Sequence, residues 1–260
     1  MIPTTEQLAK IAGRAANDNM ASIVAGLAKW KGEDGLGEPQ ILAHYLAQLA
    51  HESGRFRWDR EIWGPTPTQK RYEGRRDLGN TQPGDGSKFR GYTSMMITGR
   101  HNTSKFEEWC RQRFGDEVPS FITNPKDMLL DPWEGLAPIW YWTTRGLSRY
   151  AAENDIEMIT RRINGGLNGF ADRLRCYDRS ALVLLGRGPQ YVRAFQAGAG
   201  LTVDGISGPR TRAALHAALG ELQAAAPKND PDPIPAAKPD ERMKRIAALA
   251  EEIATLAKGA

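Results

Sequence analysis

Two glutamates in contrasting settings are the side chains of this chain best suited to chemistry. Glu52 closes an apolar stretch in the segment Ala-His-Glu-Ser-Gly at residues 50–54, and Glu73 follows 21 positions later among arginines. Acid–base cleavage of a glycosidic bond needs one carboxyl that carries a proton and a second that is ionised. The spacing and surroundings of this pair therefore predict a glycosidase.

The neighbours of each glutamate predict its role. Glu52 follows Tyr45 and Leu49 at helical spacing, which places its carboxyl on an apolar helix face, where burial disfavours the charged form. Arginines at positions 71, 75 and 76 lie close to Glu73 in the chain, and nearby cations favour a carboxylate. We therefore expect Glu52 to be a general acid and Glu73 a base. Taken singly, either glutamate could be structural, Glu52 as a solvent-facing helix end and Glu73 in a surface ion pair.

Most of residues 1–186 is expected to be helical, so the predicted fold class is mainly α. Apolar periodicity and end signals predict helices over residues 5–29, over residues 39–52, from residue 104, from residue 131, over residues 156–163 and over about residues 172–185. Ser104 with Glu107 matches a capping box, and Asp131 with Pro132 matches an N-cap followed by proline at the first helical position. These elements must position the two glutamates.

Residues 55–100 contain repeated glycine and proline, which predicts a long irregular loop. Loops of this length inside a compact domain are usually functional. Trp58, Trp63 and Tyr72 lie in this segment and are candidates for stacking on sugar rings. The two tryptophans could equally be anchors that hold the loop.

Length, composition and charge limit the classes of protein that fit. The 260 residues allow one sizeable core and a small appendage, and 40% hydrophobic with 25% charged residues is typical of a soluble globular protein. No apolar run approaches the roughly 18 residues of a membrane span, and the first residues lack the pattern of a signal peptide. Synthesis in the cytosol is expected, without stable membrane insertion. A net charge of +4 suits an anionic polymer such as a cell wall.

The two cysteines, Cys110 and Cys176, are too few for a disulfide framework or a zinc cluster. In a reducing compartment we expect both to be packed thiols. His44 and His51 lie seven positions apart, without the spacing of a zinc protease motif and without a well-placed third ligand. A zinc amidase is therefore a remote alternative, and no metal or other cofactor is expected.

Five segments occur in an order that is similar to glycoside hydrolase family 19, in the branch of chitinase-like bacteriophage endolysins. They are His51–Gly54, Tyr72–Arg75 with Asp77–Asn80 behind it, Arg90–Gly91, Ile97–Arg100 with Asn102, and Arg162–Gly166. The resemblance covers roughly residues 5–186. It implies a lysozyme-like helical catalytic domain over residues 1–186 that hydrolyses glycosidic bonds.

The resemblance also implies catalytic roles for three residues. Glu52 corresponds to the general acid of the family, Glu73 to the general base, and Thr98 to the residue that helps to hold the attacking water. The family mechanism is inversion, in which acid and base act on opposite faces of the sugar. The two carboxyls should then lie about 6.5–9.5 Å apart.

Further residues are implied to bind or support the substrate. Asn102 and Asn164 match asparagines that contact sugar, and Arg173 is the nearest match to an arginine that supports the acid and base. Tyr92 and Met96 depart from the family motif, where arginine and glutamine are usual. Losing the glutamine amide removes one donor and one acceptor, so we expect retained chemistry with altered or weakened substrate binding.

The C-terminal part divides into three predicted pieces. Residues 190–222 resemble the repeat unit of a small helical peptidoglycan-binding domain, residues 226–239 form a proline-rich linker, and residues 240–260 carry a helix. Only about one repeat is present where two are usual. The alternative is therefore an incomplete module that packs on the catalytic domain.

The leading hypothesis is an endolysin that hydrolyses the glycan strands of peptidoglycan. It implies a stay in the host cytoplasm, export with the help of a phage holin, and action at the periplasm or cell wall, without nucleic acid as a partner. A chitinase is the alternative within the enzymes. A non-catalytic wall-binding or phage structural protein is the alternative of another class, and the departures at Tyr92 and Met96 motivate it.

Overall fold

The structure is a computed structural model that describes residues 1–32 and 34–225, and all structural statements concern that part of the chain. The predicted linker and C-terminal helix lie outside it. The α-helices are α1 (Thr5–Ala12), α2 (Asp18–Lys29), α3 (Pro39–Glu52), α4 (Pro67–Lys70), α5 (Asp85–Lys88), α6 (Arg100–Phe114), α7 (Trp133–Thr144), α8 (Leu147–Ala152), α9 (Ile156–Asn164), α10 (Phe170–Leu184), α11 (Val192–Gly198) and α12 (Pro209–Ala225). Short 3-10 helices occupy Arg76–Leu78, Gly115–Glu117 and Pro125–Leu129. The prediction of a mainly α fold is confirmed.

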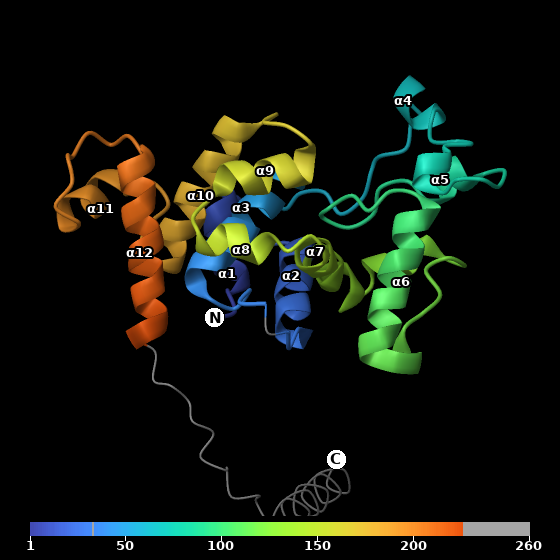
Figure 1. The fold of residues 1–260 in the computed structure, drawn as a ribbon, viewed down its shortest axis with the longest axis horizontal. Helices are drawn as coiled ribbons and strands as arrows, with labels where there is room; N and C mark the ends of the chain where they lie inside the picture. Colours follow the sequence, from blue (N-terminus) through green and yellow to red (C-terminus); the bar gives the residue numbers. More distant parts are fainter. Residues whose placement is uncertain (33, 226–260) are drawn as a thin grey trace, which may run out of the picture. The chain divides into compact units, whose positions relative to one another are not determined.

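Helix α3 forms the centre of the domain. Every residue from Ile41 to Ala50 is buried, so the helix is enclosed on all sides rather than on one face. Its most extensive contact is with α10, and it also packs on α8 (Figure 1). The end of α3 at Glu52 is therefore held by the core of the protein.

Several predicted helix limits differ from the structure. The helix expected over residues 5–29 is two helices, because Gly13 adopts a left-handed conformation with φ 71° and ends α1, while Asn17 caps α2. The start predicted at Ser104 is wrong, since α6 begins at Arg100 and Ser104 lies inside it. Helix α7 begins at Trp133, one position later than the Asp131 cap predicted.

Helices α2 and α7 cross at unusually close range through two glycines. A Cβ atom at Gly26 would lie 2.1 Å from the backbone carbon of Gly135. A Cβ atom at Gly135 would lie 1.8 Å from the carbonyl oxygen of Ser22. Only glycine allows the two backbones to approach this closely, and side chains at either position would force the helices apart.

The segment between α3 and α6 is largely irregular, as predicted, and polar side chains hold it. Asn80 is fully buried, accepts a hydrogen bond from the Arg100 amide (2.9 Å) and donates to the Tyr72 carbonyl (2.9 Å). The Arg100 guanidinium pairs with Asp85, whose side chain is 2% exposed. That hydrogen-bonded pair lowers the pKa of Asp85, although burial acts in the opposite direction. These contacts bring α4, α5 and the start of α6 together.

Helices α11 and α12 pack on the preceding helices. Leu215 and Leu219 of α12 are fully buried in the same hydrophobic core as α3 and α10. His216 contacts the carbonyl oxygen of Ala151 through Nε2 (3.0 Å), and Ser207 donates to Asp178 of α10 (2.6 Å). The division of the chain at residues 186–190 remains a prediction, and the packing favours the alternative of a module docked on the helical domain.

Both cysteines are free and buried. Across residues 1–32 and 34–225, no helix is long and apolar enough to cross a membrane.

The close crossing of α2 and α7 yields a test. Gly135→Ala should lower the free energy of unfolding by about 1–3 kcal/mol, because the added methyl meets the α2 backbone. Urea denaturation measures the change. Gly220→Ala is the control, since Gly220 lies in α12 with open space around its Cβ position, and it should leave stability unchanged or raise it by up to about 1 kcal/mol. Equal stability of both variants would contradict the crossing.

Candidate active site

A tight turn follows Glu52 and redirects the chain. Gly54, Arg55 and Phe56 are all left-handed, with φ values of 61°, 65° and 58°. Two of these residues are not glycine, and such strain persists only where the surroundings enforce it. Here Phe56 is fully buried, its amide donates to Ser53 Oγ (2.9 Å), and its carbonyl accepts from Asn17 of α2 (2.9 Å). The turn sends the segment from residue 57 onward across to α4 (Figure 1).

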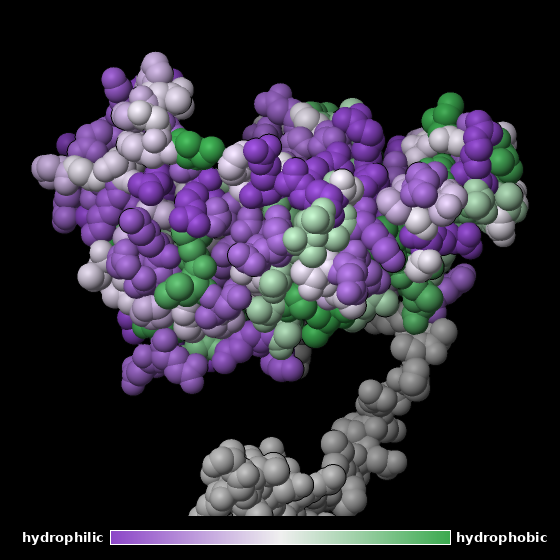
Figure 2. Space-filling view, turned by 180° about the vertical axis from the view of Figure 1, so that it is seen from behind, coloured by the Kyte–Doolittle hydropathy of each residue, from purple (hydrophilic) through white to green (hydrophobic). Residues whose placement is uncertain are grey.

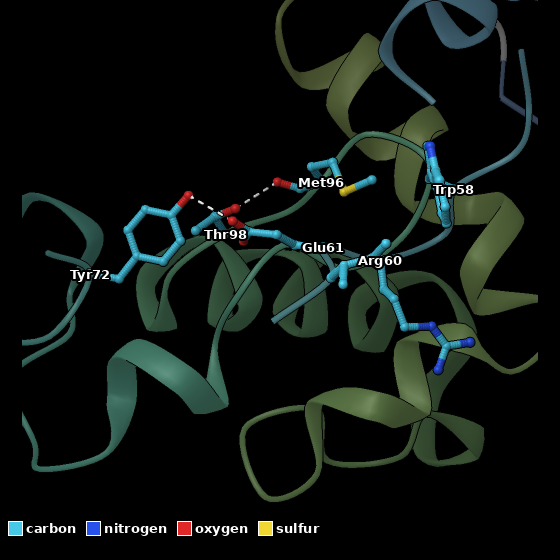
Figure 3. Close-up of a pocket in the computed structure, with 7 residues that line it drawn as sticks. Trp58, Arg60, Glu61, Tyr72, Met96 and Thr98 are labelled. Carbon is cyan, nitrogen blue, oxygen red and sulfur yellow. Dashed lines mark hydrogen bonds between the residues drawn. The ribbon is translucent and has the colours of Figure 1, made fainter. Parts of the chain in front are cut away.

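This segment lines a cavity of about 520 Å³. The cavity is lined by Trp58, Arg60, Glu61, Ile62, Tyr72, Met96 and Thr98 (Figure 3). Three of the residues predicted from the sequence, Tyr72, Met96 and Thr98, are thus brought together. Trp58, a predicted stacking candidate, joins them. Glu61 is a carboxyl that the sequence analysis did not identify.

Glu61 is held by hydrogen bonds on both carboxylate oxygens. Oε1 accepts from Gln69 Nε2 (3.0 Å) and from the Tyr72 hydroxyl (3.3 Å), and Oε2 accepts from the Gly91 amide (3.1 Å). The Glu61 amide in turn donates to the Gly91 carbonyl (2.8 Å). In all three contacts a neighbouring group donates, so both carboxyl oxygens of Glu61 act as acceptors. Burial, followed by the charge of Glu61, raises the pKa of Tyr72, which keeps it a donor.

Thr98 faces the same cavity from a tight hairpin. Its hydroxyl donates to the Met96 carbonyl (2.8 Å), which leaves the lone pairs of Oγ1 available to accept a hydrogen bond from a water. Tyr92 and Ile97 exchange two backbone hydrogen bonds that close the hairpin. Asn102, in the first turn of α6, donates to the Thr98 carbonyl (2.9 Å), so it supports the hairpin from behind.

Gly91, in the Arg-Gly segment that precedes this hairpin, has little room for a side chain. A Cβ atom at Gly91 would lie 3.2 Å from the Met96 Cβ and 3.4 Å from the Glu61 Cβ. The first distance is tighter than side chains normally tolerate. Glycine at this position therefore lets Glu61 and the Thr98 hairpin approach each other.

The two departures from the expected motif have structural explanations. Tyr92 is 2% exposed and packs in the core, where its ring lies under the Arg90 guanidinium at 5.2 Å. Met96 is half-buried, and its backbone carbonyl rather than its side chain holds Thr98. Neither departure removes the group that orients the Thr98 hydroxyl.

Glu73 lies in a different setting from the one expected. It is exposed, and its carboxylate accepts hydrogen bonds from the amides of Gly84 (2.6 Å) and Gly86 (2.8 Å) at the start of α5. The arginines near it in the sequence turn elsewhere: Arg75 pairs with Asp77 and Arg71 donates to Thr68 (3.2 Å). Glu73 is absent from the lining of the Thr98 cavity.

Glu52 also differs from its expected apolar setting, because it is paired with an arginine. Arg173 of α10 is fully buried, and its guanidinium donates to Glu52 Oε1 and to Gln48 Oε1. A buried guanidinium without a partner would be very costly, so the pair fixes the position of Glu52. The Glu52 side chain keeps 27% exposure, and its Oε2 has no hydrogen-bond partner among residues 1–32 and 34–225. The predicted association of Arg173 with the acid is thus seen in the geometry.

The residues next to this pair form a second contact between the same two helices. His51 Nδ1 lies 2.8 Å from Asp172 Oδ2, and Arg55 donates to Asp172 Oδ1 (2.8 Å). Burial of Asp172 opposes its ionisation, but the hydrogen bond with His51 and the charge of Arg55 outweigh it and lower its pKa to about 2. Asp172 and Arg173, adjacent in α10, therefore bind His51 and Glu52, adjacent at the end of α3.

Asn164 ends α9 and is exposed, without a hydrogen-bond partner among the described residues. The preceding carbonyl, that of Ile163, accepts from the Tyr141 hydroxyl (3.3 Å) of α7. Figure 2 shows the surface hollowed between the part with α9 and α10 and the part with α4 and α5. Glu52 ends α3 on the first side, and Glu61 and Thr98 belong to the cavity on the second.

The two histidines considered as metal ligands do not converge on a site. His44 is fully buried, and its ring stacks on that of Tyr177 with centroids 4.3 Å apart. Its Nε2 lies 3.1 Å from Asn154 Oδ1. Burial and the nearby His216 lower the pKa of His44 to about 3, so it stays neutral. His51 is engaged with Asp172. Within the described part of the chain, no group of three or more histidine, cysteine or acidic side chains is placed to hold a metal ion.

Comparisons with known proteins give a relative and two similar structures. No family model matches the chain. A Haemophilus influenzae protein named glycosyl hydrolase family 19 domain-containing protein is 32% identical over 162 residues, which are 52% of this chain and 76% of that protein. Chitinase C from Streptomyces griseus HUT6037 superposes with a TM-score of 0.55 at 15% identity, over 72% of this chain and 94% of that one. A bacterial family 19 chitinase superposes with a TM-score of 0.53 at 17% identity, over 73% of this chain and 97% of that one.

The Asp172 contacts predict a pH-dependent contribution to stability. Asp172→Asn should cost at most about 2 kcal/mol at neutral pH, where the native carboxylate is ionised and paired. Because its pKa is lowered on folding, the contribution is present above about pH 4 and is lost as the pH falls through about 2. Denaturant melts of both proteins between pH 7 and 2 test this. Asp77→Asn, in an exposed pair, is the control and should change little. A difference for Asp172→Asn that persists at pH 2 would contradict the assignment.

Proposed function

The chain belongs to glycoside hydrolase family 19, and from this premise we propose that it hydrolyses the glycan strands of bacterial peptidoglycan with Glu52 as proton donor and Glu61 as base. The family makes it a glycosidase of the chitinase- and lysozyme-like kind, with the helical fold of the family 19 chitinases. The substrate and the assignment of the base are the proposal.

The observation that carries the choice of base is that Glu61 and Thr98 line one cavity. A base must reach the water that attacks the sugar, and Thr98 Oγ1 is free to accept a hydrogen bond from that water. The Glu73 carboxylate instead accepts hydrogen bonds from the backbone amides of Gly84 and Gly86 at the start of α5. Glu61 therefore meets the geometric requirement that the sequence argument assigned to Glu73.

The proposed reaction follows from these positions. Glu52 gives a proton to the leaving glycosidic oxygen; Arg173 occupies Oε1, so Oε2 is the oxygen that carries the proton. A water held by Thr98 attacks the anomeric carbon from the opposite face and passes its proton to Glu61. The sugar is released with inverted configuration. Asn164 is free to contact the sugar, and Tyr72 is held in the cavity by its hydrogen bond to Glu61.

Peptidoglycan is favoured over chitin by the C-terminal segment and by charge. Residues 190–222 resemble a wall-binding repeat, in which Gln196 is buried and accepts from the Gly205 amide (2.8 Å) while donating to Asp204 (2.8 Å). A net charge of +4 suits an acidic wall. Chitinase remains the second candidate, because the similar solved structures are chitinases. Mass spectrometry of the products from both polymers separates them.

On this proposal the biological role is lysis of a bacterial host by a phage endolysin. The enzyme would stay in the host cytoplasm until a holin permits its release to the periplasm and cell wall. The role, the holin and the location rest on the resemblance of the sequence to chitinase-like endolysins. A non-catalytic role is less well supported, because Tyr92 and Met96 leave Thr98 and both candidate carboxyls in place.

Three matched amide variants test the catalytic assignment. Glu52→Gln and Glu61→Gln should each lower the release of reducing ends from purified cell walls by about 10²–10⁴-fold, because each removes a proton-transfer group. Glu73→Gln is the control and should keep most of the activity, since only a loop contact is weakened. Thermal melts confirm that each variant is folded. An inactive Glu73→Gln with an active Glu61→Gln would return the role of base to Glu73.

The departure at Met96 yields a separate prediction. Met96→Gln should lower KM for wall oligosaccharides by about 3–10-fold, because its amide adds a hydrogen-bonding group to an otherwise apolar part of the cavity. The backbone at this position, φ 50°, is equally demanding for both residues. Steady-state kinetics on soluble oligosaccharides measures the effect. No gain in either KM or turnover would show that the missing glutamine does not limit binding.

A further inference from the structure

A second cavity, distinct from the one at Glu61, lies at the other end of α6. Its volume is about 560 Å³, and Lys29, Trp30, Lys31, Asp34, Arg113 and Phe114 contribute to its lining. Arg113 lies near the end of α6, whereas Thr98 lies two residues before the start of that helix. At 1.5 Å per residue the two sites are roughly 20 Å apart. One sugar residue cannot occupy both.

Aromatic rings give this cavity a fixed shape. The rings of Trp30 and Trp109 stack with centroids 5.3 Å apart, and the guanidinium of Arg113 lies 4.3 Å from the Trp109 ring and 5.7 Å from the Trp30 ring. The Trp30 indole donates to Asp34 Oδ1 (3.1 Å), which fixes the orientation of the ring. Trp30 is partly exposed and contributes to the cavity lining, although Trp109 stacks on its ring and a Cβ atom at Gly32 would lie 1.9 Å from its Cζ2.

The cations of the cavity are poorly neutralised. Arg113 is exposed, its hydrogen bond goes to the Trp109 carbonyl (3.2 Å), and no carboxylate in the described residues pairs with it. Lys31 is exposed and has no ion pair among those residues, and Lys29 has a single loose contact with Glu117 at 3.9 Å. Asp34 is the acidic residue of the lining, and its Oδ1 accepts from Trp30 and from the Leu36 amide. Among the described lining residues, three cations therefore stand against one carboxylate, beside the Trp30 indole.

We propose that this cavity is an accessory binding site for an acidic, peptide-substituted sugar of the wall glycan. The sugar would contact the exposed part of the Trp30 indole, and Arg113 would bind a carboxylate of the peptide through its forked donors. The proposal deepens the proposed function, because it rests on peptidoglycan as the substrate. Holding the polymer about 20 Å from the cleaved bond raises the local concentration of glycan at the catalytic cavity.

The test is a titration of the full chain followed by the ¹⁵N–¹H signal of the Trp30 indole, assigned with Trp30→Phe. Muramyl dipeptide, which carries both the sugar and a carboxylate, should shift this signal saturably. N,N′-Diacetylchitobiose, which is neutral and lacks the carboxylate, and the free dipeptide, which lacks the sugar, should bind at least about tenfold more weakly. Equal binding of the free dipeptide would show an unspecific anion site, and equal binding of N,N′-diacetylchitobiose would show a neutral sugar site. Either result overturns the proposal.

Variants identify the residues involved. Arg113→Gln should weaken muramyl dipeptide binding about tenfold, because a charge-assisted contact is lost. The double variant Lys29→Gln with Lys31→Gln changes only exposed side chains and should weaken it about fivefold, which keeps the test decisive if Arg113→Gln perturbs the tryptophan stack. Arg111→Gln, on the same helix and paired with Glu107, is the matched control and should bind as the parent does. Unchanged binding in both the Arg113 and the lysine variants would overturn the proposal.

Activity measurements separate this site from the catalytic one. Arg113→Gln should hydrolyse short soluble oligosaccharides at the parent rate but act more slowly on intact sacculi. Glu52→Gln should retain the Trp30 titration while losing hydrolysis. Cleavage of walls by Glu52→Gln would refute the proposed catalytic function and leave the Trp30 titration to decide the accessory site by itself. Equal loss of Arg113→Gln activity on soluble and insoluble substrates would contradict an accessory role.

Discussion

The fully buried guanidinium of Arg173 is the constraint on which the arrangement of the candidate active site depends. A buried guanidinium without hydrogen-bond partners would be strongly destabilising, and the Glu52 carboxyl and the Gln48 amide oxygen accept its hydrogen bonds. The pair can form only if the end of α3 lies against the start of α10. Asp172, the neighbour of Arg173, engages His51 and Arg55 at the same place. Two consecutive residues of α10 therefore set both the position and the orientation of the proposed proton donor.

The opposite side of the site is built by backbone contacts rather than by a core helix. The left-handed turn after Glu52 leads the chain to Glu61, and Gly91 allows Glu61 and the hairpin of Thr98 to approach closely. Gln69 and Tyr72, from α4 and the turn after it, complete the set of donors around the Glu61 carboxylate. The proposed donor is thus held by core helices and the proposed base by a network of loops, and acid–base hydrolysis requires these two roles.

The sequence predicted the features that depend on local signals. The apolar spacing and Pro39 defined α3 correctly, and Glu52, Tyr72, Met96 and Thr98 were identified as candidate site residues from motif order. The start of α6 was missed because its first amide is bound by Asn80, 20 positions earlier, whereas Ser104 and Glu107 match a cap motif by chance inside the helix. Long-range partners of this kind leave no local pattern.

The proposed base, Glu61, differs from the predicted base, Glu73, for the same reason. Arginines close to Glu73 in the chain suggested a stabilised carboxylate, but their side chains bind Asp77 and Thr68 instead. The partners of Glu61 come from residues 69, 72 and 91, and they are recognisable only after folding. Two acidic residues, Asp59 and Glu61, lie between Trp58 and Trp63 in the sequence, and acidic residues in a loop are too common to single out Glu61.

A crystal structure of the Glu52→Gln protein with a bound wall oligosaccharide would show whether Glu61 and Thr98 hold the attacking water. We expect an ordered water within hydrogen-bond distance of both the Glu61 carboxylate and Thr98 Oγ1, facing the anomeric carbon on the side opposite residue 52. A sugar bound with that water on Glu73, or with Glu61 turned away from the anomeric carbon, would contradict it.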